Sequence, residues 1–123
     1  LTFYRAAFPH WEVRGSGVQD WYGTQRTWMH FGDEKDYLAF ADSGTGDNRN
    51  LESNIMGLAH FGFITENITA TIERLQQAGF AIHKQGNNTE FRKNIYFLDP
   101  NGYEVEFVEY LSDNPKERNN YDS

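Results

Sequence analysis

The clearest pattern of hydrophobic positions lies in the second half of the chain. Ile68, Ile72 and Leu75 recur at the spacing of one face of an α-helix. Asn67 before them can act as an N-cap, and Gly79 after them can end the helix. We therefore predict an amphipathic helix over residues 67–78.

The segments on either side of this helix alternate as strands do. Residues 57–65 (GLAHFGFIT) place apolar side chains at every second position. Shorter strands are predicted near 80–84, 92–98 and 103–110, and the sequence DPNG between the last two is typical of a tight turn. Residues 57–110 therefore form a predicted βαβββ module.

The first half repeats this order over residues 1–42. Its segments are the end of a helix at 1–8, a short strand at 11–15, and a hairpin of 26–32 with 36–42. Phe8 matches Phe80 after each helix, and Phe31 matches Phe97 in equivalent strands. A strand equivalent to residues 57–65 would precede Leu1, so we expect the first module to lack its first strand.

Two polar segments complete the organisation. Residues 43–56 contain glycine and few apolar side chains, so we predict a linker between the modules. Residues 111–123 show no period, and we expect a mobile tail. The predicted fold class is α+β, with paired βαβββ modules that form a curved mixed sheet around a cleft.

Composition narrows the possible functions. A length of 123 residues fits a single domain, and the absence of cysteine excludes disulfides and thiolate chemistry. The net charge of −7 and the lack of clustered Lys and Arg argue against a nucleic-acid partner. No apolar run reaches the roughly 18 residues of a membrane helix, and no leader is visible, so we expect no membrane partner and a cytoplasmic location.

Strand alternation brings two possible metal ligands to one side of the second sheet. In the last strand Val105 and Phe107 should pack on the helix, which turns Glu104 and Glu106 to the opposite face. In the first strand of this module the same alternation turns His60 to that face. An imidazole and a carboxylate that converge in this way can bind one divalent ion. The alternatives are a structural histidine and a solvated carboxylate.

The second half resembles a known family. The segment GLAHFGF, a helix ending in AGF, and IYFLDPNGYEVEFVEY are similar to the C-terminal half of vicinal oxygen chelate proteins, which include glyoxalases, bleomycin-resistance proteins and extradiol dioxygenases. In that family a His on the first strand and a Glu on the last strand of the module bind metal, and His60 and Glu106 match these positions. The resemblance implies a divalent metal ion (Fe, Mn, Ni or Zn), a small oxygen-bearing substrate and a homodimer.

The first module departs from the four-ligand pattern of glyoxalase I. Ala39 stands where Glu106 stands in the second module, and alanine cannot bind metal. The three-ligand pattern of extradiol dioxygenases and fosfomycin-resistance proteins stays possible if the missing strand supplies a His. His30, which should face the cleft beside Trp28, is a further candidate ligand.

The leading functional expectation is a metal-dependent enzyme of lyase, isomerase or dioxygenase type. Glu104 is the candidate catalytic base. Trp28, Tyr37 and Tyr110 are the candidate substrate contacts. The alternative is a metal-free protein of bleomycin-resistance type that binds or sequesters a small molecule, for which the acidic charge would suit a cationic drug.

Overall fold

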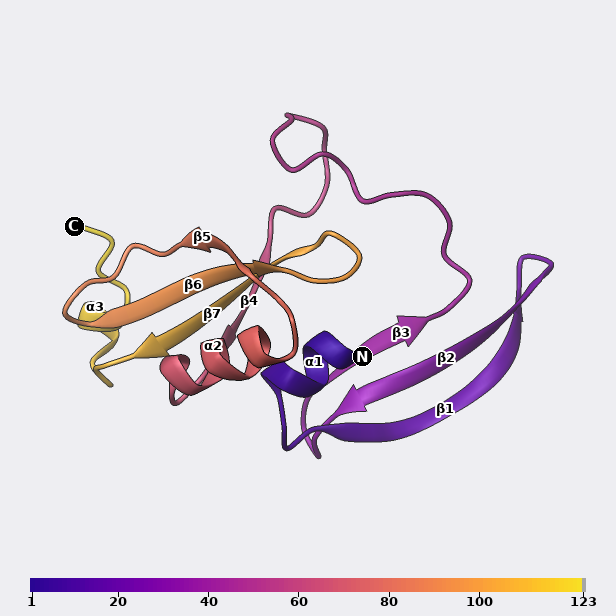
Figure 1. Cartoon of the computed structure of the whole chain (residues 1–123), viewed down its shortest axis with the longest axis horizontal. Helices are drawn as coiled ribbons and strands as arrows, with labels where there is room; N and C mark the ends of the chain where they lie inside the picture. Colours follow the sequence, from indigo (N-terminus) through magenta and orange to yellow (C-terminus); the bar gives the residue numbers. More distant parts are fainter. Residues whose placement is uncertain (123) are drawn as a thin grey trace. The chain divides into compact units, whose positions relative to one another are not determined.

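The computed structural model describes residues 1–122 and contains two compact units. One unit comprises Leu1–Ala7 with the chain from Asp47 onward, and the other comprises Phe8–Gly46. The described residues form seven strands and three helices (Figure 1). This mixed content agrees with the predicted α+β class. None of the helices in the described part of the chain is long and apolar enough to cross a membrane.

The larger unit contains the predicted βαβββ module. Its sheet has the order β4-β7-β6-β5, in which β4 is parallel to β7 and the other pairs are antiparallel. The strands are β4 (Phe61–Ile64), β5 (Ile82–Gln85), β6 (Arg92–Leu98) and β7 (Glu104–Tyr110). Strand β4 is shorter than the predicted segment 57–65, so His60 lies immediately before the strand.

Helix α2 (Ile68–Gln77) forms between the two residues that the sequence indicated. The side chain of Asn67 accepts a hydrogen bond from the Ala70 N–H at 3.1 Å, and Gly79 has a positive φ of 96° after the C-cap. The helix start receives a second hydrogen bond from Glu109 of β7, whose Oε1 accepts from the Ile68 N–H at 2.9 Å. Glu109 thus satisfies an orphan N–H group at the start of the helix.

One face of this sheet forms the core. The side chains of Phe97, Val105 and Phe107 are fully buried there, together with Leu75 of α2 and Phe3 of α1 (Thr2–Ala7). Arg74 of α2 donates from Nε to the Ala6 carbonyl at 2.8 Å, which fixes α1 against α2. Helix α1, which the sequence places in the first module, therefore packs in the unit of the second module.

The DPNG turn is tied to α1 by a buried hydrogen bond. Asp99 Oδ1 accepts from the N–H groups of Asn101 and Tyr103, while the Tyr4 hydroxyl donates to Asp99 Oδ2 at 2.7 Å. Gly102 completes the turn with a positive φ of 82°. Burial, followed by the contact with the Asp99 carboxylate, raises the pKa of Tyr4 far above its usual value.

The smaller unit is an antiparallel sheet in the order β1-β2-β3. Its strands are β1 (Glu12–Trp21), β2 (Thr24–Gly32) and β3 (Tyr37–Ala41). The predicted hairpin of β2 and β3 is present, and Asp33 Oδ1 accepts from the N–H groups of Lys35 and Asp36 in its loop. Within the described chain β3 pairs only with β2, whereas the equivalent β7 has β4 on its other side. In the described residues the smaller sheet thus has three strands and the larger one has four.

Strand β1 is longer than the predicted residues 11–15. It continues to Trp21 and turns into β2 through Tyr22 and Gly23, whose φ values of 48° and 83° are both positive. Two central residues with positive φ are typical of a type I′ hairpin turn. Tyrosine is an uncommon first residue for this turn, so the turn was not predicted from the sequence.

Part of the segment that we expected to be mobile makes defined contacts. It contains helix α3 (Pro115–Arg118), capped by the Asn114 side chain. Arg92 of β6 donates to the Asn120 carbonyl at 2.7 Å and to the Arg118 carbonyl at 3.2 Å. The Arg118 guanidinium in turn lies over the Tyr110 ring, 4.2 Å from its centroid. These contacts join the tail, as far as it is described, to β6 and β7.

Replacing Phe107 by Ala should destabilise the protein by about 3–5 kcal/mol, because the ring is fully buried between sheet and helices. Urea denaturation measures this change in the free energy of unfolding. Ile64→Ala on neighbouring β4 is the control, since Ile64 is 65% exposed and its truncation should cost no more than about 0.5 kcal/mol. Equal effects of the two substitutions would contradict the assigned core face.

Tyr4 should make the protein sensitive to alkaline pH. Its folded pKa lies above the unfolded value of 10.0, so its contribution is complete below pH 10 and is lost as the pH rises above it. By pH 11 the loss should reach about 1.4 kcal/mol in the free energy of unfolding. Urea denaturation at pH 8 and pH 11 should show a smaller decline for Tyr4→Phe than for the wild type. Tyr22→Phe, at a ring that is 91% exposed, should decline as the wild type does.

Candidate functional site

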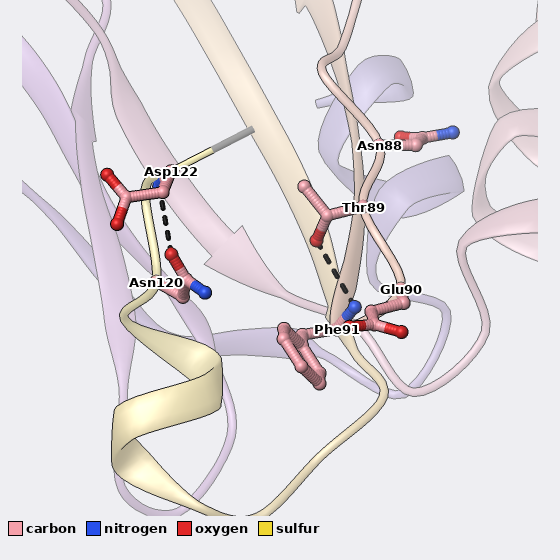
Figure 2. A pocket seen from close by; sticks show the side chains of 6 residues that line it. All are labelled: Asn88, Thr89, Glu90, Phe91, Asn120 and Asp122. Atoms are coloured by element: carbon pink, nitrogen blue, oxygen red, sulfur yellow. Dashed lines mark hydrogen bonds between the residues drawn. The ribbon is translucent and has the colours of Figure 1, made fainter.

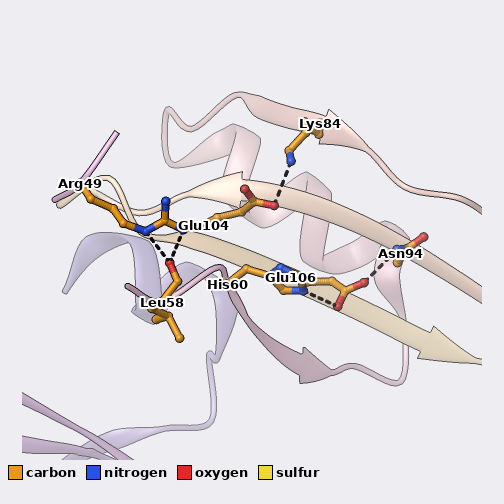
Figure 3. A network of polar contacts seen from close by, with 7 residues as sticks. All are labelled: Arg49, Leu58, His60, Lys84, Asn94, Glu104 and Glu106. Carbon is orange, nitrogen blue, oxygen red and sulfur yellow. Dashed lines mark hydrogen bonds and ion pairs between the residues drawn. The ribbon is translucent and has the colours of Figure 1, made fainter. Parts of the chain in front are cut away.

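His60 and Glu106 meet at the edge of the larger sheet. The parallel register places Gly62 beside Glu106, and His60, two residues earlier, lies on the same side. His60 Nε2 is 3.6 Å from Glu106 Oε1 (Figure 3). The two groups therefore converge as the strand alternation predicts. Their side chains are 40% and 21% exposed, so a ligand can reach both of them.

The Glu106 carboxylate is oriented by its neighbours. Asn94 Nδ2 donates to Glu106 Oε2 at 2.8 Å, which leaves Oε1 directed toward His60. Gly62 provides the space for this arrangement, because a Cβ atom at that position would lie 3.2 Å from Oε1. The site thus depends on an amide donor and on a missing side chain.

The segment that leads into His60 is also restrained. Arg49 donates from Nη2 to the Leu58 carbonyl at 2.9 Å and from Nε at 3.2 Å (Figure 3). This forked contact with one carbonyl limits the movement of the irregular segment before β4. It therefore helps to hold His60, although the residue lies outside the strand.

Tyr96 is the third side chain next to this pair. It is opposite Glu106 in the antiparallel register of β6 and β7, and its ring meets the His60 ring edge-on with 5.5 Å between centroids. Burial, followed by the negative charge of Glu106, raises the pKa of Tyr96. Its hydroxyl therefore stays protonated at neutral pH and can donate a hydrogen bond.

Glu104, the candidate base, is engaged elsewhere. Its side chain is only 8% exposed, and its Oε1 is 3.2 Å from Lys84 Nζ (Figure 3). This ion pair compensates the charge of a carboxylate that would otherwise be buried alone. The structure accordingly shows Glu104 as a paired group rather than a free carboxylate facing a ligand.

Tyr110 lies away from His60 and Glu106. It follows Glu106 by four residues on β7, a distance of about 13 Å along a strand. Its ring packs under Arg118 of the tail. Tyr110 therefore contacts the C-terminal tail, whereas His60 and Glu106 lie next to each other.

The remaining candidates form an aromatic face in the smaller unit, which we define as Trp28, His30 and Tyr37. His30 stacks on Tyr37 with 4.2 Å between ring centroids, and Trp28 lies 5.3 Å from His30. A Cβ atom at Gly17 would lie 3.0 Å from the Trp28 ring, so the glycine makes space for the indole. The structure groups His30 with these rings, whereas His60 and Glu106 belong to the larger unit.

Two hollows lie outside these groups. One, of about 360 Å³, is lined by Asn88, Thr89, Glu90, Phe91, Asn120 and Asp122 (Figure 2). The other, of about 800 Å³, lies in the smaller unit and is lined by side chains of both charges, among them Glu12, Arg14 and Lys35. None of the candidate site residues lines either hollow, so neither changes the site assignment.

A sequence model described as the Glyoxalase/Bleomycin resistance protein/Dioxygenase superfamily matches residues 1–107. The chain belongs to this superfamily. Solved structures share the superfamily fold. A glyoxalase family protein from Enterococcus faecalis is 21% identical with a TM-score of 0.67, over 88% of this chain and 84% of that one. A comparison with curated proteins gave no match.

Two other similar structures carry functional descriptions of their own. The fosfomycin resistance protein FosX from Listeria monocytogenes is 16% identical with a TM-score of 0.64, over 95% of this chain and 85% of that one. TnmS3, an antibiotic binding protein from Streptomyces, is 14% identical with a TM-score of 0.51, over 89% and 83%. At these identities the likeness establishes the fold of this superfamily member.

In this chain, the geometry of the His60–Glu106 pair suits a shared metal ion. Two donors about 2.1 Å from one tetrahedral ion lie about 3.4 Å apart, close to the observed 3.6 Å. The same distance is too long for a direct hydrogen bond. Among residues 1–122, no third His, Cys, Asp or Glu joins the two to complete a metal-binding group. The pair thus supplies two donors at a spacing that fits one ion.

Two residues next to His60 and Glu106, Asn94 and Tyr96, were not predicted from the sequence. Both alternate with the buried Ile95 and Phe97 along β6. Counting back from the DPNG turn pairs residue 98 with 104 and residue 96 with 106, which brings Tyr96 opposite Glu106. The signal was therefore present in the hairpin register.

Proposed function

We propose that this protein is a metal-dependent enzyme that acts on a small oxygen-bearing substrate, with His60 and Glu106 as ligands of a divalent ion. The observation that carries the proposal is the 3.6 Å separation of His60 Nε2 and Glu106 Oε1 on an accessible face. In addition, His60 forms no hydrogen bond within residues 1–122, and its side chain is 40% exposed. This disfavours a buried structural histidine.

The proposed chemistry is stabilisation of negative charge on a substrate oxygen. A bound Fe, Mn, Ni or Zn ion would supply Lewis-acid charge for this step. Tyr96, whose ring lies beside His60 and opposite Glu106, would donate a hydrogen bond to the same or a neighbouring oxygen. The proposal covers lyase, isomerase and dioxygenase reactions that pass through an enolate-like or oxyanion charge.

Metal analysis of protein purified without a poly-His tag tests the proposal. After incubation with Mn²⁺ or Zn²⁺ and removal of excess ion, the wild type should retain close to one ion per chain. His60→Ala and Glu106→Gln should each lose this stoichiometric binding, because either change removes a ligand. His83→Ala is the matched control and should bind as the wild type does, since His83 is exposed on β5. A metal-free wild type, or undiminished binding by both variants, would contradict the proposal.

A second candidate function, metal-free binding of a small molecule, is favoured by the aromatic face. Trp28, His30 and Tyr37 lie side by side on one surface of a sheet, with Gly17 clearing space for the indole. Aromatic rings arranged in this way can stack on a planar ligand. The structurally similar TnmS3 is described as an antibiotic binding protein, which supports this candidate.

Titration with metal-free bleomycin tests the second candidate. If the aromatic face binds it, tryptophan fluorescence should change on titration, and Trp28→Ala should weaken binding about tenfold through lost stacking. Val18→Ala is the control, because Val18 is 60% exposed and alternates away from Gly17 on β1. No binding by the wild type, or equal binding by Trp28→Ala, would exclude a bleomycin site on this face.

A further inference from the structure

We infer that Asn94 is a positioning residue that fixes which oxygen of Glu106 is presented for metal binding. The inference rests on the proposed function of His60 and Glu106. It assigns a role to the uncharged side chain of Asn94 on β6 and to Gly86, which packs against it.

The hydrogen bonding of Asn94 is set by Glu106. Asn94 Nδ2 donates to Glu106 Oε2 at 2.8 Å, while Asn94 Oδ1 is buried without a hydrogen-bond partner among the described residues. An ionised carboxylate only accepts hydrogen bonds, so the opposite orientation of the amide would place two acceptors together. The amide therefore keeps its donor on Glu106 even though its buried Oδ1 stays unpaired, which is uncommon for a buried polar atom.

The contact with Asn94 determines how Glu106 can act as a ligand. The terminal torsion of a glutamate is broad, so a free carboxylate turns easily. With Oε2 held by Asn94, Oε1 stays 3.6 Å from His60 Nε2, the separation that suits two ligands of one ion. Groups that hydrogen-bond to a ligand in this way orient it, and their loss typically weakens metal binding about 10–100-fold.

Asn94 is itself held by the loop between β5 and β6. Its N–H donates to Asn88 Oδ1 at 3.0 Å. A Cβ atom at Gly86 would collide with both Oδ1 and the backbone carbonyl of Asn94. Only glycine therefore allows the loop to close against Asn94. Gly86 should influence metal binding although it has no side chain and is not a ligand.

The experiment is a Zn²⁺ titration in competition with a chromophoric chelator. Asn94→Ala should weaken Zn²⁺ binding about 10–100-fold. Asn94→Leu should weaken it to a similar extent, because it keeps a side chain of similar size and removes the donor without adding a charge. The visible spectrum of bound Co²⁺ should also change in both variants, which a purely structural role would not produce. Asn87→Ala, in the same loop but exposed, is the matched control and should leave both readouts unchanged.

The glycine gives an independent test. Gly86→Ala should weaken Zn²⁺ binding in the same direction as Asn94→Ala. Gly44→Ala is its control, because a Cβ atom there meets nothing within 4 Å. The melting temperature of the metal-free variants reports on folding, and Asn94→Leu decides the matter if Asn94→Ala does not fold.

The outcomes separate the two levels of the proposal. Wild-type affinity in both Asn94 variants would overturn the positioning role and leave His60 and Glu106 as ligands. A wild type that binds no Zn²⁺ would overturn the proposed function, and the positioning role with it. Weaker binding in Asn94→Ala, Asn94→Leu and Gly86→Ala, with both controls unchanged, supports the inference.

Discussion

The parallel pairing of β4 with β7 is the constraint on which the candidate site depends. Its register sets Gly62 beside Glu106 and Phe63 beside Phe107. Because side chains alternate along a strand, this single register sends the aromatic pair to the core and His60 toward Glu106. A slip of one residue would reverse both assignments at once. The burial of Phe107 and the approach of His60 to Glu106 therefore both follow from the same strand register.

The two faces of the larger sheet differ in character, since one is apolar and buried and the other carries polar side chains. On one face Phe97, Val105 and Phe107 are fully buried beneath α1 and α2. The other face carries the polar network around Glu106. Since β7 is packed from behind, its backbone holds Glu106 in place, and Asn94 then orients the carboxylate. A site on a packed strand is held more precisely than one on a loop.

Local patterns in the sequence predicted the second module and its His60–Glu106 pair, because alternation, the α2 caps and the DPNG turn all act over a few residues. Contacts between distant residues were not predictable in this way. The packing of α1 on α2 depends on Arg74 and the Ala6 carbonyl, and the order of the tail depends on Arg92. The Tyr22-Gly23 turn was missed because tyrosine seldom adopts positive φ.

The central claim is that the imidazole of His60 and the carboxylate of Glu106 bind the same metal ion. Anomalous X-ray diffraction from crystals soaked in Mn²⁺ measures this most directly. The account predicts a peak within about 2.0–2.2 Å of both His60 Nε2 and Glu106 Oε1. A peak bound by other residues, or electron density with His60 turned toward the helical layer, would contradict it.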